Sequence, residues 1–240
     1  MAKAKYLGVV QTIVSRIKAG TYQAGDLLPN QQALANELGV SRLTVKKALD
    51  GLERKGIIYK QSGLGTFVSS AIPIRSKIDS PANVFTGLME LMKADNIKSK
   101  IIKFSVGFPN KQIQKNLNLT SSEPVYNIIR LRLVDDNPLV IEHTYMPVNL
   151  VPNLNTDILH SSIYNYIHQK LKLKFGHAYR KIKATKSDEY DQKYLAAKKD
   201  DPMLELEQIV WLTNGKPIEY SISRNRYDQR DYTIIENTRF

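Results

Sequence analysis

The segment at residues 39–52 reads GVSRLTVKKALDGL and combines hydroxyl and cationic side chains with a helical repeat of apolar ones. Its apolar residues, from Val45 to Leu52, have the i, i+3, i+4, i+7 spacing of one buried stripe on an amphipathic helix. The polar residues Ser41, Arg42, Thr44, Lys46 and Lys47 stand off that stripe. Most of them belong to the first turns, where unpaired backbone N–H groups and the helix dipole attract anions. The pattern predicts an anion-binding helix start.

The preceding residues predict two more helices that would hold this one in place. Apolar residues at helical spacing between positions 7 and 17 predict the first helix. Asn30 is a suitable N-cap for a short helix over residues 31–38, which Gly39 would end. Two short helices joined by so tight a turn indicate a helix-turn-helix, whose second helix enters the DNA major groove.

After these helices, residues 57–70 read IIYKQSGLGTFVSS and predict a β-hairpin. Two short β-rich runs flank SGLG, where glycine permits positive φ and close backbone approach. A hairpin in this position is the wing of a winged helix.

Composition and charge agree with a polyanionic partner. The chain has 240 residues, a formal net charge of +12 and a sequence pI near 9.6. Residues 1–70 hold 10 Lys/Arg against 4 Asp/Glu, so the positive charge is densest near the N-terminus. Cysteine is absent, which excludes disulfides, Cys-ligated zinc and thiol catalysis. No apolar run of about 18 residues and no signal peptide is recognised, so we expect a cytoplasmic protein without membrane contact.

A Pro- and Ser-containing stretch suggests two domains. We expect a DNA-binding domain at residues 1–70, a linker at 71–84 and a second domain at 85–240.

Residues 27–68 resemble the winged-helix DNA-binding domain of the gluconate-repressor-like (GntR) family. Arg42, Thr44 and Lys46 match its recognition helix. Gly63, Gly65 and Thr66 match its wing. The family commonly has a DNA-contacting arginine where this chain has Gln32. The complete set of expected DNA-contacting residues is Gln32, Ser41, Arg42, Thr44, Lys46, Lys60, Gly63, Gly65 and Thr66.

Within this set the side chains suit different contacts. The planar fork of Arg42 matches guanine O6 and N7, whereas Lys46 and Lys60 suit phosphates. We expect a homodimer that reads a near-palindromic DNA operator, because two half-sites multiply the contacts of one small domain.

The second domain is expected to be α+β with an antiparallel sheet. Strands are predicted at residues 99–109, 125–147 and 209–223, the last two segments being hairpins, and helices at 161–175 and 188–199.

Alternation along these strands places Arg130 and Arg132 on one face, with Glu142 on the neighbouring strand. Two adjacent guanidinium groups attract an oxyanion. Glu219 and Ser221 share a face of the last hairpin. A purely structural alternative is that these charged side chains pair with one another on a solvated face of the sheet.

Residues 80–236 resemble the effector-sensing UTRA domain of the HutC subfamily, which has a chorismate-lyase-like fold. The resemblance implies that an Arg-x-Arg pair and a Ser-x-Tyr segment bind the phosphate of a sugar phosphate, and that a glutamate reaches sugar hydroxyls. It also includes a C-terminal segment with Asn225 in place of a usual histidine. The expected effector-binding residues are Arg130, Arg132, Glu142, Ser162, Tyr164, Glu219, Ser221, Arg226, Asp228 and Tyr232.

The expected function is a transcriptional repressor that a small phosphorylated metabolite releases from DNA. One alternative is a chorismate-lyase-like enzyme, but no catalytic or metal-binding motif is recognised, and we expect no enzyme activity, cofactor or metal. Another is a DNA-binding protein whose second domain only dimerises. The effector, the operator and the direction of the effect stay open.

Overall fold

The computed structural model of the protein describes residues 2–54, 56–70, 78–81 and 97–233. The chain divides into two compact units, Met1–Ser76 with Thr233–Phe240, and Lys77–Tyr232. Most of the expected linker at 71–84 lies outside the described residues. The expected domain boundaries therefore stay a prediction.

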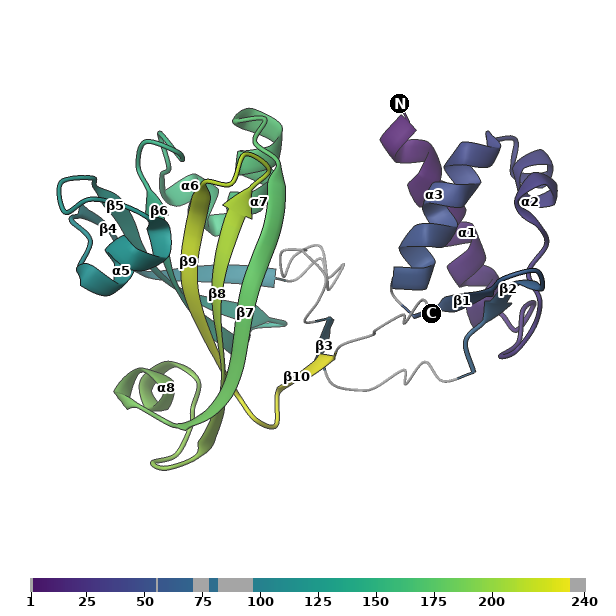
Figure 1. Ribbon diagram of the computed structural model, residues 1–240. Helices are drawn as coiled ribbons and strands as arrows, with labels where there is room; N and C mark the ends of the chain where they lie inside the picture. The colour runs from purple at the N-terminus through teal and green to yellow at the C-terminus, as the bar shows by residue number, and fades with distance from the viewer. Residues whose placement is uncertain (1, 55, 71–77, 82–96, 234–240) are drawn as a thin grey trace. The chain divides into compact units, whose positions relative to one another are not determined.

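The first unit contains three helices and a hairpin (Figure 1). The helices are α1 (Ala2–Lys18), α2 (Gln31–Leu38) and α3 (Arg42–Arg54), and the hairpin strands are β1 (Ile58–Gln61) and β2 (Gly65–Val68). These elements agree with the predicted winged helix.

Local signals explain the boundaries of α2. The Asn30 side chain accepts a hydrogen bond of 2.9 Å from the backbone N–H of Ala33 and caps the helix. Gly39 ends it in the left-handed conformation at φ 62°. The apolar stripe of α3 from Val45 to Leu52 is buried against residues of α1 and α2, including Ile13 and Leu34.

The second unit is built on a six-stranded antiparallel sheet of order β4-β5-β6-β9-β8-β7 (Figure 1). Its strands are β4 (Ile97–Gly107), β5 (Val125–Val134), β6 (Asn137–Pro147), β7 (Phe175–Lys186), β8 (Pro202–Leu212) and β9 (Pro217–Arg226). A separate two-stranded ribbon pairs β3 (Ile78–Pro81) with β10 (Arg230–Thr233). The α+β fold class is confirmed.

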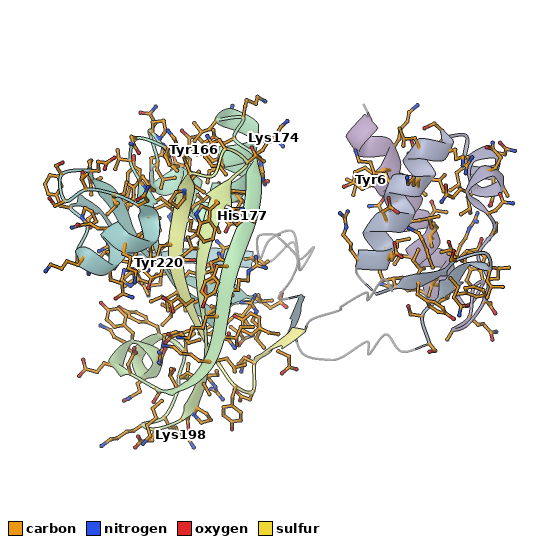
Figure 2. The ribbon with its side chains drawn as sticks, viewed as in Figure 1. Tyr6, Tyr166, Lys174, His177, Lys198 and Tyr220 are labelled. Atoms are coloured by element: carbon orange, nitrogen blue, oxygen red, sulfur yellow. The ribbon has the colours of Figure 1, made fainter. Side chains whose placement is uncertain are left out.

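Short helices cover both faces of the sheet. We call the face that carries Ile128 and Arg130 the front face, and it packs against α6 (Thr156–His160), α7 (Ile163–Asn165) and the π-helix η1 (Tyr166–Lys170). The back face carries Ile129 and packs against α5 (Lys111–Leu117) and α8 (Glu189–Tyr194). Side chains of both units are drawn in Figure 2, where Tyr220 marks the back-face side of β9. In the part of the chain that the structure describes, no helix could span a membrane.

The prediction of helix over residues 161–175 is wrong beyond its first half. The helical segment stops after Lys170, Lys172 takes a left-handed φ of 58°, and Phe175 already belongs to β7. Pairing with β8 therefore overrides the local helical pattern. The helix predicted at 188–199 is also shorter, because Ala196, two residues after the end of α8, takes a left-handed φ of 52°.

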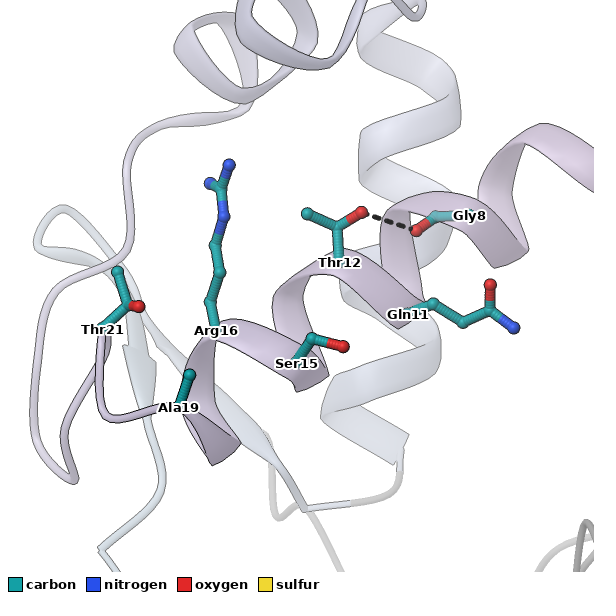
Figure 3. Close-up of a pocket in the computed structure, with 7 residues that line it drawn as sticks. All are labelled: Gly8, Gln11, Thr12, Ser15, Arg16, Ala19 and Thr21. Atoms are coloured by element: carbon teal, nitrogen blue, oxygen red, sulfur yellow. Dashed lines mark hydrogen bonds between the residues drawn. The ribbon is translucent and has the colours of Figure 1, made fainter.

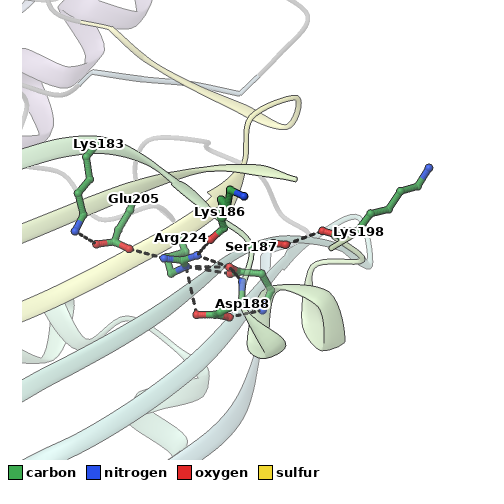
Figure 4. Close-up of polar contacts among 8 residues, drawn as sticks. Lys183, Lys186, Ser187, Asp188, Lys198, Glu205 and Arg224 are labelled. Atoms are coloured by element: carbon green, nitrogen blue, oxygen red, sulfur yellow. Dashed lines mark hydrogen bonds and ion pairs between the residues drawn. The ribbon is translucent and has the colours of Figure 1, made fainter. Parts of the chain in front are cut away.

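An ion-pair network fixes α8 to the back face (Figure 4). The Arg224 guanidinium on β9 lies 2.5 Å from Asp191 Oδ2 on α8 and 2.5 Å from Glu205 Oε2 on β8. It also donates to the carbonyl of Lys186 at 2.9 Å. Because Asp191 is fully buried, we expect the loss of this network to destabilise the fold, unlike the loss of an exposed ion pair.

Candidate DNA-binding surface and effector site

The start of α3 presents its cations to solvent. Ser41 Oγ accepts a hydrogen bond from the Thr44 backbone at 3.2 Å and lies 2.9 Å from Thr44 Oγ1, so both hydroxyls organise the first turn. Arg42 and Lys46 are exposed, and within the described residues neither has an ion-pair partner. Gln32, on α2, is exposed and bonds to Asn36 of the next turn at 3.0 Å. Two unpaired cations at a helix start suit DNA phosphates and base edges.

The wing depends on two glycines. Gly63 and Gly65 have φ of 76° and 128°, a region that side chains disfavour. A Cβ at Gly65 would also meet Leu27 Cδ1 at 2.6 Å. Thr66, half-buried, pairs with Lys60 across the hairpin.

Lys60 on β1 forms ion pairs with α3. Its ammonium lies 2.5 Å from Asp50 Oδ1 and 2.7 Å from Glu53 Oε2, both on α3. Glu53 has only 12% of its side chain exposed, so the pair is partly shielded from water. These pairs hold the wing strand to α3 and compete with the expected phosphate contact of Lys60, which stays a prediction.

On the front face, strand register gathers polar side chains from all six strands of the sheet. Arg130 on β5 stands opposite Glu142 on β6, and Arg132 stands opposite Ser99 on β4. On the other half of the sheet, Ser221 of β9 stands opposite Gln208 of β8, which is itself opposite Arg180 of β7. Glu219 lies on the same face, two residues before Ser221.

The two arginines are buried but incompletely satisfied. Arg130 is 8% exposed, pairs with Glu142 at 2.7 Å and donates to the Leu159 carbonyl at 3.1 Å. Arg132 is 3% exposed and donates to Ser99 Oγ at 2.6 Å, and among the described residues no carboxylate forms an ion pair with it. Neither Nε has a hydrogen-bond partner in that part of the chain. A buried guanidinium without an ion-pair partner is costly, and the two arginines share one nearby carboxylate, that of Glu142.

The pKa values of the two glutamates of this face are shifted in opposite directions. Burial opposes ionisation of Glu142, but Arg130, Arg132 and Arg230 outweigh it and lower the pKa of that carboxyl below its usual value. Burial raises the pKa of Glu219, although Ser221, Gln208 and Tyr164 donate to its carboxylate. The Ser221 and Gln208 bonds measure 2.7 and 2.8 Å.

Tyr164 joins this cluster from the helical side. Its hydroxyl accepts from Gln208 Nε2 at 3.2 Å, and burial raises its pKa. Ser162 instead caps α7 through the backbone N–H of Asn165 at 3.2 Å. The structure therefore brings Tyr164 into contact with the sheet cluster and gives Ser162 a capping contact.

The ribbon strand β10 contributes two further residues. Tyr232 donates to Asn225 Oδ1 at 3.3 Å, and the Arg230 guanidinium lies 4.8 Å from the Tyr232 ring centroid. Asn225 is fully buried on β9, on the same face as Ser221. This contact links the segment after β9 to the polar cluster.

Arg226 and Asp228 do not join the cluster, contrary to expectation. Their side chains pair with each other at 2.5 Å, and Arg226 donates to the carbonyl of Ala196 just after α8. Because Arg226 follows Asn225 directly, it points to the back face.

The sequence reasoning missed several residues of this site. Arg180 was overlooked because residues 175–186 were not recognised as a strand. Ser99 and Gln208 stand at or just outside the ends of predicted strands, and the period-two rule alone does not say which strands are neighbours. The available signal for Gln208 was its position two residues before Val210, since alternation places both on the same face of the strand.

A surface depression of about 520 Å³ on α1 is a different feature (Figure 3). Its lining includes Gly8, Thr12 and Arg16. The Arg16 guanidinium already pairs with Glu37 and bonds to Tyr22 at 3.2 Å. The depression therefore offers no unpaired charge to a ligand, and we assign none.

Comparison with known proteins supports both halves of this description. Residues 5–68 match the family described as bacterial regulatory proteins, gntR family, and residues 93–230 match the UTRA domain. The chain is 41% identical to the HTH-type transcriptional regulator GmuR of Bacillus subtilis, over 96% of this chain and 98% of that protein. It is 28% identical to the mannosyl-D-glycerate transport/metabolism system repressor MngR of Escherichia coli, over 96% and 94% of the two chains.

A solved structure agrees over nearly the whole length. The possible transcriptional regulator YydK from Bacillus subtilis superposes with a TM-score of 0.82 at 30% identity, covering 97% of this chain and 99% of that one. These relatives are regulators and not enzymes, which excludes the chorismate-lyase-like alternative. The chain belongs to the GntR family of DNA-binding transcriptional regulators, in the group that carries a UTRA domain.

Proposed function

We propose that the protein is a transcriptional repressor that binds a near-palindromic operator as a homodimer, and that a small phosphorylated sugar bound on the front face of the sheet releases it. A DNA operator places such a repressor in the bacterial cytoplasm. The observation that carries the effector proposal is Arg132, a guanidinium with 3% exposure and no ion-pair partner among the described residues. A phosphate group would supply the missing charge and accept hydrogen bonds from the unpartnered Nε atoms of both arginines.

The charge balance of the site supports a phosphate over a carboxylate. Arg130, Arg132, Arg180 and Arg230 face two glutamates, and burial favours the neutral form of Glu219. A phosphate near neutral pH carries a charge of about −1.5 to −2, which offsets this excess better than one carboxylate does.

The other half of the site supports a polyhydroxylated partner. Glu219, Gln208, Ser221 and Tyr164 offer both acceptors and donors, and they are bonded to one another. Sugar hydroxyls could replace those mutual bonds one for one. MngR is named for a system that handles a sugar derivative, which agrees with this class of effector.

Calorimetry on the full-length protein tests the effector. The probes are glucose 6-phosphate, mannose 6-phosphate and N-acetylglucosamine 6-phosphate, each paired with its unphosphorylated sugar. At least one phosphorylated sugar should bind, and Arg132→Ala should weaken it about tenfold or more, because a charge-assisted hydrogen bond contributes about 1.5–3 kcal/mol. If none of the phosphorylated sugars binds or raises the thermal midpoint, a purely dimerising second domain becomes the better description.

Titration of the effector with and without bound operator tests release. Reciprocity requires that DNA weaken effector binding by the same factor that the effector weakens DNA binding, commonly about 5- to 150-fold. Equal dissociation constants would disprove the coupling, and tighter binding in the presence of DNA would make the effector a co-repressor.

A further inference from the structure

Leu43, the second residue of α3, is an apolar side chain at the point of the helix most distant from the core. It is 73% exposed, and no large hydrophobic residue in the described part of the chain exceeds this value. At about 100° per residue it lies about 170° from the middle of the stripe formed by Val45, Ala48, Leu49 and Leu52. The exposure of Leu43 therefore follows from the register of α3, and no packing contact with the winged-helix core explains it.

The neighbours of Leu43 are cationic. Arg42 precedes it, and Lys46 and Lys47 follow at i+3 and i+4, one turn along the same surface. Lys47 Nζ lies 5.9 Å from the centroid of the Tyr6 ring, and Arg42 and Lys46 are exposed. An apolar protein partner placed here would desolvate these charges without compensation.

A DNA major groove compensates them and also offers an apolar contact. Its phosphates pair with the cations, and the C5 methyl of thymine is the apolar group that base pairs present in that groove. One leucine among three cations is complementary to that combination.

We infer that Leu43 is a specificity-determining residue, which contacts a thymine methyl group in the half-site whose guanine Arg42 reads. The contact buries apolar surface only in the complex. Removal of one methyl or methylene group from such a contact lowers affinity about fourfold. This inference rests on the DNA-binding activity of the family and is independent of the effector site.

Selection from a pool of duplexes with a randomised 30-base-pair centre provides the probe, since the operator is not identified. Full-length wild type, Leu43→Ala and Lys46→Ala are selected in parallel. Wild type should enrich thymine at one fixed position of each half-site, and Leu43→Ala should lose that preference while keeping the other positions. Lys46→Ala, the matched control from the same surface, should bind all sequences more weakly with unchanged base preferences.

A second measurement removes the methyl group from the DNA. Deoxyuridine at the enriched position should weaken wild-type binding about fourfold and leave Leu43→Ala unaffected, because the two changes delete opposite sides of one contact. Thermal unfolding should show the same midpoint for Leu43→Ala and wild type, since the side chain is exposed. Equal thymine enrichment by both proteins, or wild-type affinity that ignores the methyl group, overturns the inference.

Discussion

Arg130 and Glu142 stand directly opposite each other on strands β5 and β6 and form an ion pair of 2.7 Å between Nη2 and Oε2. Arg132, two residues further along β5, is more deeply buried and has no such pair within the described residues. One strand thus carries, side by side, a guanidinium with an ion pair and a guanidinium without one. A buried guanidinium without an ion pair costs free energy, and the anion site proposed above would use its charge.

Replacement of the Arg132 charge should have opposite effects on the stability of the protein and on effector binding. Arg132→Met keeps much of the volume and removes a buried charge that forms no ion pair within the described residues, so we expect the ligand-free protein to gain about 1 kcal/mol or more in free energy of unfolding. Binding of the sugar phosphate should be lost. Denaturant titration without ligand and calorimetry with it measure the two effects. Arg130→Met is the matched control, and it should destabilise the protein because it leaves Glu142 without its partner. A loss of stability in Arg132→Met would show that Arg132 is adequately solvated or paired.

Glu219 should make stability decrease as pH rises. Its pKa is raised in the folded protein by burial, so the folded state holds the proton more tightly than the unfolded chain does. The resulting stability is fully present below the unfolded pKa of about 4.3 and is lost as pH rises through the higher folded pKa. Glu219→Gln should lack this loss and exceed wild type in stability at neutral pH.

Chemical unfolding of wild type and Glu219→Gln between pH 4 and pH 8 measures the difference between them. The difference should shrink toward acidic pH. A constant difference across the range would mean that Glu219 titrates as it does in the unfolded chain. Comparing the two proteins also cancels the contribution of Glu142, whose pKa is lowered and whose stabilisation is instead lost toward acid.

Lys60 should position the wing without contacting phosphate. Lys60→Met breaks its pairs with Asp50 and Glu53, so we expect lower thermal stability of the winged helix and weaker DNA binding. The slope of log affinity against log salt should stay unchanged, because no released counter-ion is lost. Lys46→Ala is the comparison, and it should reduce that slope by about one. A slope reduced equally by both variants would restore the phosphate role of Lys60.

Asp191 should be important for folding and unimportant for ligand binding. Asp191→Ala removes one of the two buried carboxylates that pair with Arg224 at 2.5 Å, and we expect a loss of about 3 kcal/mol in free energy of unfolding. Because this network lies on the back face, effector affinity measured below the unfolding transition should match wild type. A selective loss of effector affinity would contradict the separation of the two faces.

The local sequence was sufficient to predict the elements whose formation depends on residues only a few positions apart. The cap at Asn30, the left-handed turn at Gly39 and the glycines of the wing depend on backbone preferences that neighbouring residues decide. Alternation along β5 was likewise enough to place Arg130 and Arg132 on one face. Those signals account for the winged helix and for the two arginines of the proposed anion site.

The remaining features depend on contacts between distant parts of the chain. Strand pairing brings Gln208 and Arg180 to the site, and it forms β7 over residues 175–186, which were not recognised as a strand from their sequence. The carboxylates that form ion pairs with Lys60 lie on α3, whereas the charge pattern of the hairpin alone indicated a phosphate contact. Strand order and the burial of charges are decided by tertiary packing, because each residue's partners come from strands or helices that its local pattern does not specify.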